Sequence, residues 1–114
     1  METTILAKSS SRDEPYAVAI SLTETGLSFF CNCPAGEWGK YCKHKMAIVL
    51  GDAKILYNDE QIENFNKVSK WISESDYPFL VAKLRNSEKE LEAVKEKVKN
   101  MKEEISRSMK EGLK

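Results

Sequence analysis

The sequence predicts an α+β fold: a small antiparallel sheet and a short helix, followed by further helices and a long, coiled-coil-like C-terminal helix. Three observations predict it. Apolar residues alternate with small or polar ones in the N-terminal third of the chain. All three cysteines and the one histidine then fall within a single short window. In the C-terminal half, apolar residues recur at helical spacing.

Three strands are expected between residues 3 and 33. Thr3–Lys8 is a short strand, and the polar residues 9–13 form the turn after it. In residues 16–22, Tyr, Val, Ile and Leu alternate with Ala, Ala and Ser, which is the period of a strand with one buried face. Thr25-Gly26 is a turn signal, and residues 27–31 return as the third strand. The pattern predicts an antiparallel meander.

Two adjacent aromatic residues mark the third strand. Phe29 and Phe30 point to opposite faces of the sheet, because successive side chains alternate along a strand. We therefore expect both faces to be covered, one of them by a helix from the second half of the chain.

Three helices are expected after the sheet. Residues 42–50 form a short helix with an apolar side, and Gly51 ends it. Residues 60–73 form a second helix, because their apolar residues recur at helical spacing. Residues 79–109 form a long third helix whose polar face is dense in lysine and glutamate.

The long helix carries an apolar seam with the a/d spacing of a coiled coil. The seam comprises Leu84, Leu91, Val94, Val98, Met101 and Ile105. An isolated helix of this length is marginal in water, so we expect it to form a homodimer. The alternatives are a helix that lies on the rest of the chain and a charged, solvated rod. In a parallel dimer Glu90 attracts the partner's Lys95, whereas Lys97 repels the partner's Lys102. These charges leave the orientation open.

Every cysteine and the one histidine lie within residues 31–44, CNCPAGEWGKYCKH. Cys31 and Cys33 share one face of an extended strand, and Gly36 and Gly39 let the following loop fold tightly. Cys42 and His44 are less than one helical turn apart, so they belong at a helix entry. Two such local pairs supply the four ligands of a tetrahedral Zn²⁺ ion. Because four protein ligands close the site, we predict one structural zinc ion.

Disulfides fit this window less well than metal does. The cysteine count is odd, and the N-terminus lacks the basic start and apolar run of a signal peptide. No apolar stretch is long enough to span a bilayer. We therefore expect no membrane association and a cytoplasmic location, or a nuclear one in a eukaryote, where structural disulfides are rare. A redox pair at Cys31 and Cys33, or a sensor that releases zinc on oxidation, is the alternative.

Composition argues against several functions. Lys+Arg and Asp+Glu are both 18, so the whole chain has no general attraction to nucleic acid or to an anionic membrane. A Ser-His-Asp arrangement would need His44, which the metal claims. The glycines fit no phosphate-binding or dinucleotide-binding loop. We therefore expect no enzyme.

Aromatic and basic residues interleave beside the predicted zinc ion. They are Trp38, Lys40, Tyr41, Lys43 and Lys45. Such residues contact a protein partner, or bind nucleic acid through phosphates and stacked bases. In the alternative interpretation, the aromatic residues pack the loop against the hairpin and the lysines offset the thiolate charge. Acidic and basic residues balance within residues 1–58, which weakens the interpretation as a nucleic-acid site.

The pattern C-x-C-P…C-x-H, after an alternating strand and before the apolar residues 46–50, resembles the SWIM-type zinc finger. The serine-rich turn before Tyr16, Pro34 and Lys43 are also similar to that family. The resemblance covers about residues 3–51. It implies a ββα-like zinc module that serves as a DNA- or protein-binding accessory, as in helicase-like remodelling ATPases, transposases and signalling kinases. Its ligands would be Cys31, Cys33, Cys42 and His44.

These inferences divide the chain into three parts. Residues 1–57 are a SWIM-like zinc-binding module, residues 58–76 an amphipathic helix packing on it, and residues 77–114 a long charged helix that forms a coiled coil. The predicted function is a non-enzymatic interaction module, an adaptor or accessory for protein partners. The alternative function is a DNA-binding accessory protein that uses the basic and aromatic zinc loop.

Overall fold

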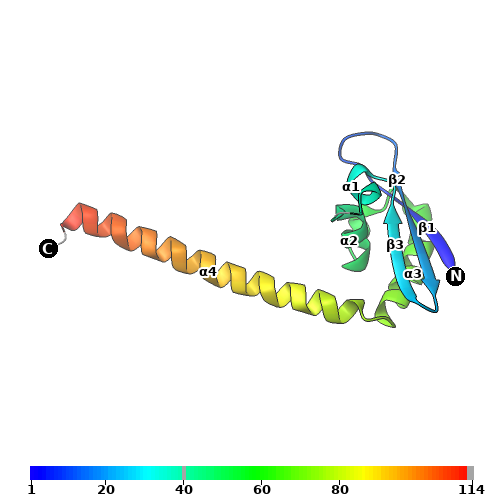
Figure 1. Cartoon of the computed structure of the whole chain (residues 1–114). Helices are drawn as coiled ribbons and strands as arrows, with labels where there is room; N and C mark the ends of the chain where they lie inside the picture. Colours follow the sequence, from blue (N-terminus) through cyan, green and yellow to red (C-terminus); the bar gives the residue numbers. More distant parts are fainter. Residues whose placement is uncertain (40, 113–114) are drawn as a thin grey trace. The chain divides into compact units, whose positions relative to one another are not determined.

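The computed structural model describes residues 1–39 and 41–112. It confirms the α+β class: a three-stranded antiparallel sheet in the order β1-β2-β3 is followed mainly by helices (Figure 1). The strands are β1 (Glu2–Ala7), β2 (Tyr16–Thr23) and β3 (Gly26–Cys31). The helices are α1 (Pro34–Glu37), α2 (Lys43–Val49), α3 (Ile62–Ser73) and α4 (Tyr77–Glu111), with two 3-10 helices, η1 (Ala53–Ile55) and η2 (Asp59–Gln61). The chain divides into two compact units, Met1–Pro78 and Phe79–Lys114.

The strand register places one row of apolar residues across the buried face of the sheet. Ile5 pairs with Val18, and Val18 pairs with Cys31. All three side chains are fully buried. Cys31, at the end of this row, is also the first predicted metal ligand. The predicted metal site therefore adjoins the core of the sheet.

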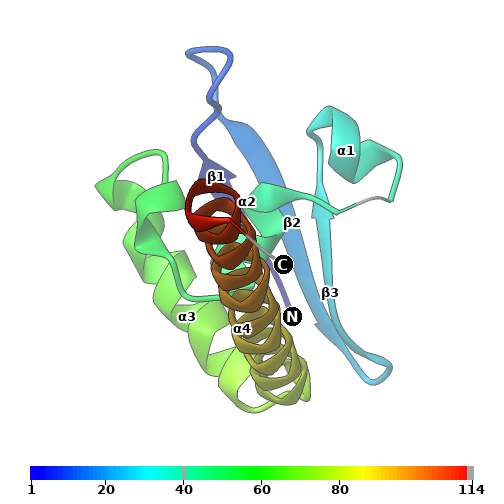
Figure 2. The same ribbon diagram turned by 90° about the vertical axis from the view of Figure 1, so that its left-hand side faces the viewer.

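The helices α2 and α3 complete the core on that face (Figure 2). Ile48 of α2 is buried there, as are four apolar residues of α3, which repeat at helical spacing. The four are Phe65, Val68, Trp71 and Ile72. The opposite face is open at Phe30, whose side chain is 54% exposed. The expectation that both faces are covered is therefore wrong, because the helices of the first unit pack on the same face.

The segment between α2 and α3 covers the free edge of β1. The Leu6 N–H donates to Gln61 Oε1 at 2.9 Å, and the Leu6 carbonyl accepts from the Tyr57 N–H at 3.0 Å. The Lys8 N–H donates to the Ile55 carbonyl at 2.7 Å. An unpaired strand edge invites association with other chains, and these bonds satisfy it within the chain.

The predicted elements lie close to the observed ones. Each predicted strand is found within one residue at either end, and the long predicted helix is four residues shorter than α4. The sequence pattern missed α1, which was expected as a turn, and η2 replaces the first turn of the predicted helix over residues 60–73. In the part of the chain that the structure describes, none of the helices has both the length and the apolar character needed to cross a bilayer.

Tyr77, the first residue of α4, belongs to the first unit. Its hydroxyl donates to the Leu27 carbonyl at 2.7 Å, and its ring meets the Phe29 ring edge-on with centroids 5.5 Å apart. These contacts hold Tyr77 against β3 within the first unit. Such an edge-on aromatic pair adds stabilisation beyond the area it buries.

The buried amide of Gln61 provides a test of the hydrogen bonds that cover the free edge of β1. We expect Gln61→Ala to lower the free energy of unfolding by about 1–3 kcal/mol, because it leaves the Leu6 N–H without a partner. Chemical denaturation of the zinc-loaded protein measures the change. Asn64→Ala is the matched control, since Asn64 contacts the Thr4 carbonyl at an exposed position. Equal losses in the two variants would contradict the role given to Gln61.

Candidate metal centre

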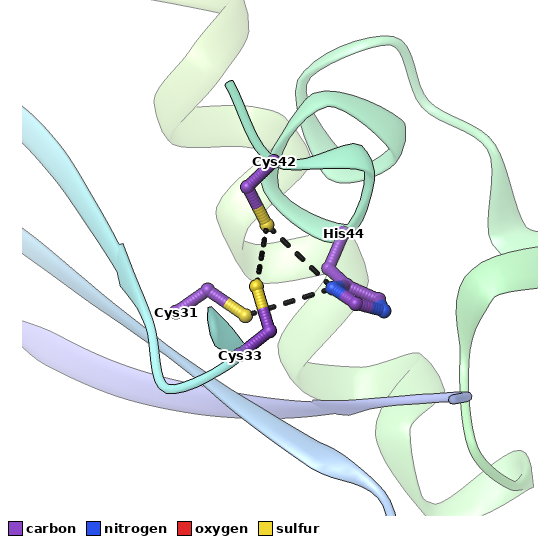
Figure 3. A group of neighbouring side chains, drawn as sticks. All are labelled: Cys31, Cys33, Cys42 and His44. Atoms are coloured by element: carbon purple, nitrogen blue, oxygen red, sulfur yellow. Dashed lines mark hydrogen bonds between the residues drawn. The ribbon is translucent and has the colours of Figure 1, made fainter. Parts of the chain in front are cut away.

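The four predicted ligands come together in one buried cluster (Figure 3). The cluster comprises Cys31, Cys33, Cys42 and His44. All four side chains are buried, and their ligand atoms lie within 4.8 Å of one another. Two local segments, one at the end of the hairpin and one at the start of α2, supply a pair each.

Three of the distances in the cluster are close to those expected around a tetrahedral zinc ion. Cys33 Sγ lies 3.4 Å from Cys42 Sγ, and His44 Nδ1 lies 3.7 Å from Cys31 Sγ and 3.6 Å from Cys42 Sγ. Four ligands about 2.0–2.3 Å from a central zinc ion are ~3.5–3.8 Å apart. The sulfur separation is far beyond a disulfide bond of about 2.05 Å, and all three cysteines are free. The ligand atoms are therefore close enough together for one metal ion to contact all four.

The hairpin continues past β3 and so orients the first pair. The Asn32 N–H donates to the Ala17 carbonyl at 3.2 Å, and Asn32 Oδ1 accepts from the Ala17 N–H at 2.9 Å. These two bonds keep the chain extended at Asn32. Cys31 and Cys33 consequently point to the same side, since residues two apart share a face of extended chain.

Cys33 is both a predicted ligand and the N-cap of α1. Its sulfur accepts a hydrogen bond from the Gly36 N–H at 3.2 Å, and Pro34 occupies the first turn, where its missing N–H costs nothing. A Cβ on Gly36 would clash with the Cys31 carbonyl oxygen, so only glycine fits there. The conformation of the turn after the first pair therefore depends on the close contacts of Gly36 with Cys33 and Cys31.

The second pair stands at the start of α2, as the spacing predicted. Cys42 is the N-cap, and His44 is in the first helical turn. The Cys42 carbonyl accepts from the Met46 N–H at 3.0 Å, but its sulfur accepts no capping bond from α2. The N–H that stabilises a thiolate comes from α1 and goes to Cys33.

The local environment affects each ligand differently. Burial raises the pKa of the Cys31 thiol to about 12. Burial also acts to raise the pKa of the Cys33 thiol, but the Gly36 N–H and the sulfurs of Cys42 and Cys31 outweigh it, and the pKa lies below its usual value. Burial, followed by the charge of Lys43, lowers the pKa of His44. His44 is therefore a neutral imidazole near pH 7, which is the form that binds metal.

The imidazole is held from its other side by aromatic packing. The Tyr16 ring lies 5.0 Å from the His44 ring, and the Arg12 guanidinium lies 3.9 Å above Tyr16. His44 Nε2 is buried and has no hydrogen-bond partner within the described residues, whereas Nδ1 faces the sulfurs. Nδ1 is thus the nitrogen presented to a metal. Three buried sulfurs and one imidazole are a donor set that structural zinc sites use.

The aromatic residues Trp38 and Tyr41, in the loop between the two ligand pairs, do not pack against the hairpin. Trp38 is 79% exposed and Tyr41 is 71% exposed, so the expectation that they pack the loop is wrong. The Lys43 ammonium donates to Ser10 Oγ at 2.7 Å, and Lys45 is half-buried. Lys40 lies outside the described residues. An open pocket of about 460 Å³ adjoins the ligands; Ser9–Ser11, Tyr41 and Lys43 are part of its lining.

The cluster is compatible with a zinc finger and can bind a metal ion. No protein-family profile, curated protein or solved structure matches this chain. The assignment of the site therefore depends on its geometry: the donor types, their spacing and their burial.

Gly36 offers a test of the site that leaves all four ligands in place. We expect Gly36→Ala to weaken zinc binding by about 10–100-fold, because the new Cβ displaces the Cys31 carbonyl or the Cys33 cap. Competition against a chromogenic chelator measures the affinity.

Gly39→Asn is the matched control for this variant. Gly39 has φ +68, the space beside its Cα is open, and asparagine tolerates this conformation. Zinc affinity unchanged in Gly36→Ala, or lowered equally in Gly39→Asn, would contradict the contact.

Proposed function

We propose that this chain is a non-enzymatic zinc-binding interaction module of the SWIM type, acting as an adaptor for protein partners. The observation that carries the proposal is the closed, buried set of three sulfurs and one imidazole with exposed aromatic residues beside it. A second contact would come from α4.

The donor set supports one structural zinc ion. Zinc accepts a tetrahedral mixture of thiolates and imidazole, whereas iron–sulfur clusters take four cysteines or two cysteines and two histidines. Catalytic zinc keeps one position for water, and here four protein ligands fill the shell. The one histidine of the chain belongs to this set. These points support a structural ion and a function without catalysis.

The arrangement around the ligands supports the SWIM type. An antiparallel sheet leads into the C-x-C-P turn, and the C-x-H pair opens the helix α2. The family similarity implied a ββα-like module with these four ligands. The order of elements in the first unit agrees with that expectation.

Trp38 and Tyr41 support a protein partner. Both lie in the loop between the two ligand pairs, and both expose most of their side chain to water. Tryptophan and tyrosine are over-represented among the residues that carry binding energy at protein interfaces. The zinc ion would hold this loop in one conformation, which lowers the entropy lost on binding.

The charge distribution favours a protein over DNA. Lys43 beside the loop supports DNA binding, but its ammonium is engaged by Ser10. The chain has no excess of positive charge. DNA binding depends strongly on phosphate neutralisation, so the DNA alternative has less support.

Removal of the metal tests the first part of the proposal. We expect purified, reduced protein to hold one zinc ion per chain, and an excess of chelator to abolish the near-ultraviolet circular dichroism of the first unit. Zinc binding contributes on the order of 10–16 kcal/mol in zinc-finger peptides, which equals or exceeds the stability of a small domain. Protein purified without metal, or a spectrum unchanged by the chelator, would contradict the proposal.

The exposed aromatic residues test the second part. We expect Trp38→Ala and Tyr41→Ala to retain zinc but to lose partners that wild-type protein captures in a quantitative pulldown. Tyr57→Ala, which changes an exposed tyrosine outside the loop, should keep them. A parallel titration with labelled duplex DNA at low salt tests the alternative. Tight binding that falls steeply with salt and is lost in Lys43→Glu would replace the protein partner with DNA.

A further inference from the structure

The apolar seam of α4 is open to water along its whole length. α4 has no buried residue among those described, and the seam side chains are 39–62% exposed. In heptad terms, the a positions are Leu84, Leu91, Val98 and Ile105, and the d positions are Leu80, Ser87, Val94 and Met101. A seam of this kind is stable in water when a second helix covers it.

The charged residues beside the seam are ordered. The e positions carry Glu88, Lys95 and Lys102, and the g positions carry Lys83, Glu90, Lys97 and Glu104. Residues at e and g lie across from each other in a helix pair and set its orientation. Lys95 contacts Glu92 of its own helix at 3.7 Å, but both side chains are exposed and such a pair contributes little.

We propose that α4 pairs with α4 of a second copy of this chain in antiparallel orientation, with Leu91 opposite the partner's Val94. In this register every charged pair next to the seam is attractive. Lys83 faces the partner's Glu104, Glu90 faces the partner's Lys97, and Glu88 faces the partner's Lys95. Two-fold symmetry forms each pair twice. The inference deepens the proposed second contact and does not depend on the metal centre.

The same register matches the apolar layers. Leu80 lies opposite the partner's Ile105. Leu84 lies opposite the partner's Met101. Ser87, the polar residue of the seam, lies opposite the partner's Val98. All apolar a and d residues from Leu80 to Ile105 thus meet a residue of the other seam.

The parallel orientation is less complementary. Lys83 would attract the partner's Glu88 and Glu90 the partner's Lys95. Lys97, however, would repel the partner's Lys102. Like charges across an interface lower its stability and disfavour that arrangement.

The antiparallel registers shifted by one heptad are less complementary still. With Leu91 opposite the partner's Met101, Lys95 and Lys97 face their own copies and Glu90 faces the partner's Glu104. Only Glu88 with the partner's Lys102 and Lys83 with the partner's Glu111 attract in that register.

The shift in the other direction fails for the same reason. With Leu91 opposite the partner's Ser87, Glu88 and Glu90 face their own copies. Lys83 then faces the partner's Lys97. No charged e or g pair within the described residues attracts in this register.

The antiparallel register has a consequence for the two zinc modules. Pro78, where the first unit ends, lies opposite the partner's Arg107. The two copies of Pro78 are then roughly 43 Å apart along the helix axis, at a rise of 1.5 Å per residue. The dimer would present two modules from opposite ends of the helix pair.

The test uses the full, zinc-loaded chain at low ionic strength, because exposed charge pairs are screened by salt. We expect sedimentation equilibrium to give two chains per particle, and Lys97→Glu to raise the dimer Kd about tenfold, since Glu90 then meets a glutamate. The double variant Glu90→Lys, Lys97→Glu should restore the wild-type Kd. In a parallel dimer Lys97→Glu would instead tighten association, because the partner's Lys102 would be attracted.

The helix itself is little affected by these substitutions. Neither Glu90 nor Lys97 has a charged residue three or four positions away in α4, so no intrahelical pair changes. Leu91→Asp provides the monomeric reference. A wild-type monomer at high concentration, a particle of more than two chains, tighter association of Lys97→Glu, or no rescue by the double variant would overturn the inference. Zinc content is measured in each variant, so such a failure is distinguished from failure of the metal centre.

Discussion

The first unit depends on one constraint: three buried sulfurs and one imidazole must lie close to one another. The cluster joins the end of β3, the N-cap of the short helix α1 and the start of α2. Burial raises the pKa of the Cys31 thiol to about 12, so this group ionises near neutral pH only when a cation compensates it. A metal ion bound by these four ligands would therefore form a cross-link between the sheet and the helices.

Backbone groups around the sulfurs contribute to this arrangement. Asn32 extends the hairpin by one residue, and Gly36 brings its N–H to Cys33 and its Cα close to the Cys31 carbonyl. The apolar core shared by the sheet, α2 and α3 then carries the two segments to the same place. The loop of Trp38 and Tyr41 remains exposed beside this arrangement.

Much of the fold could be predicted because its signals are local. Alternation in residues 16–22 and helical spacing in residues 60–73 follow from which side chains face the core. Both patterns can therefore be recognised without knowledge of the tertiary contacts. The ligand window was evident from residue types and spacing alone. Phe30 was expected to be covered and is exposed, because exposure depends on which elements pack nearby, and no local pattern encodes that. The helix α1 was missed because it is four residues long and is capped by a cysteine sulfur.

The sequence by itself determined the element types, the four candidate ligands and the charged edges of α4, since each depends on the order of side chains along one segment. Only the tertiary structure decided that the helices of the first unit share one face of the sheet and that His44 presents Nδ1 to the sulfurs. It also decided that the stabilising N–H for a thiolate comes from Gly36. These features depend on distances between segments that lie apart in the chain, and those distances exist only once the core has packed.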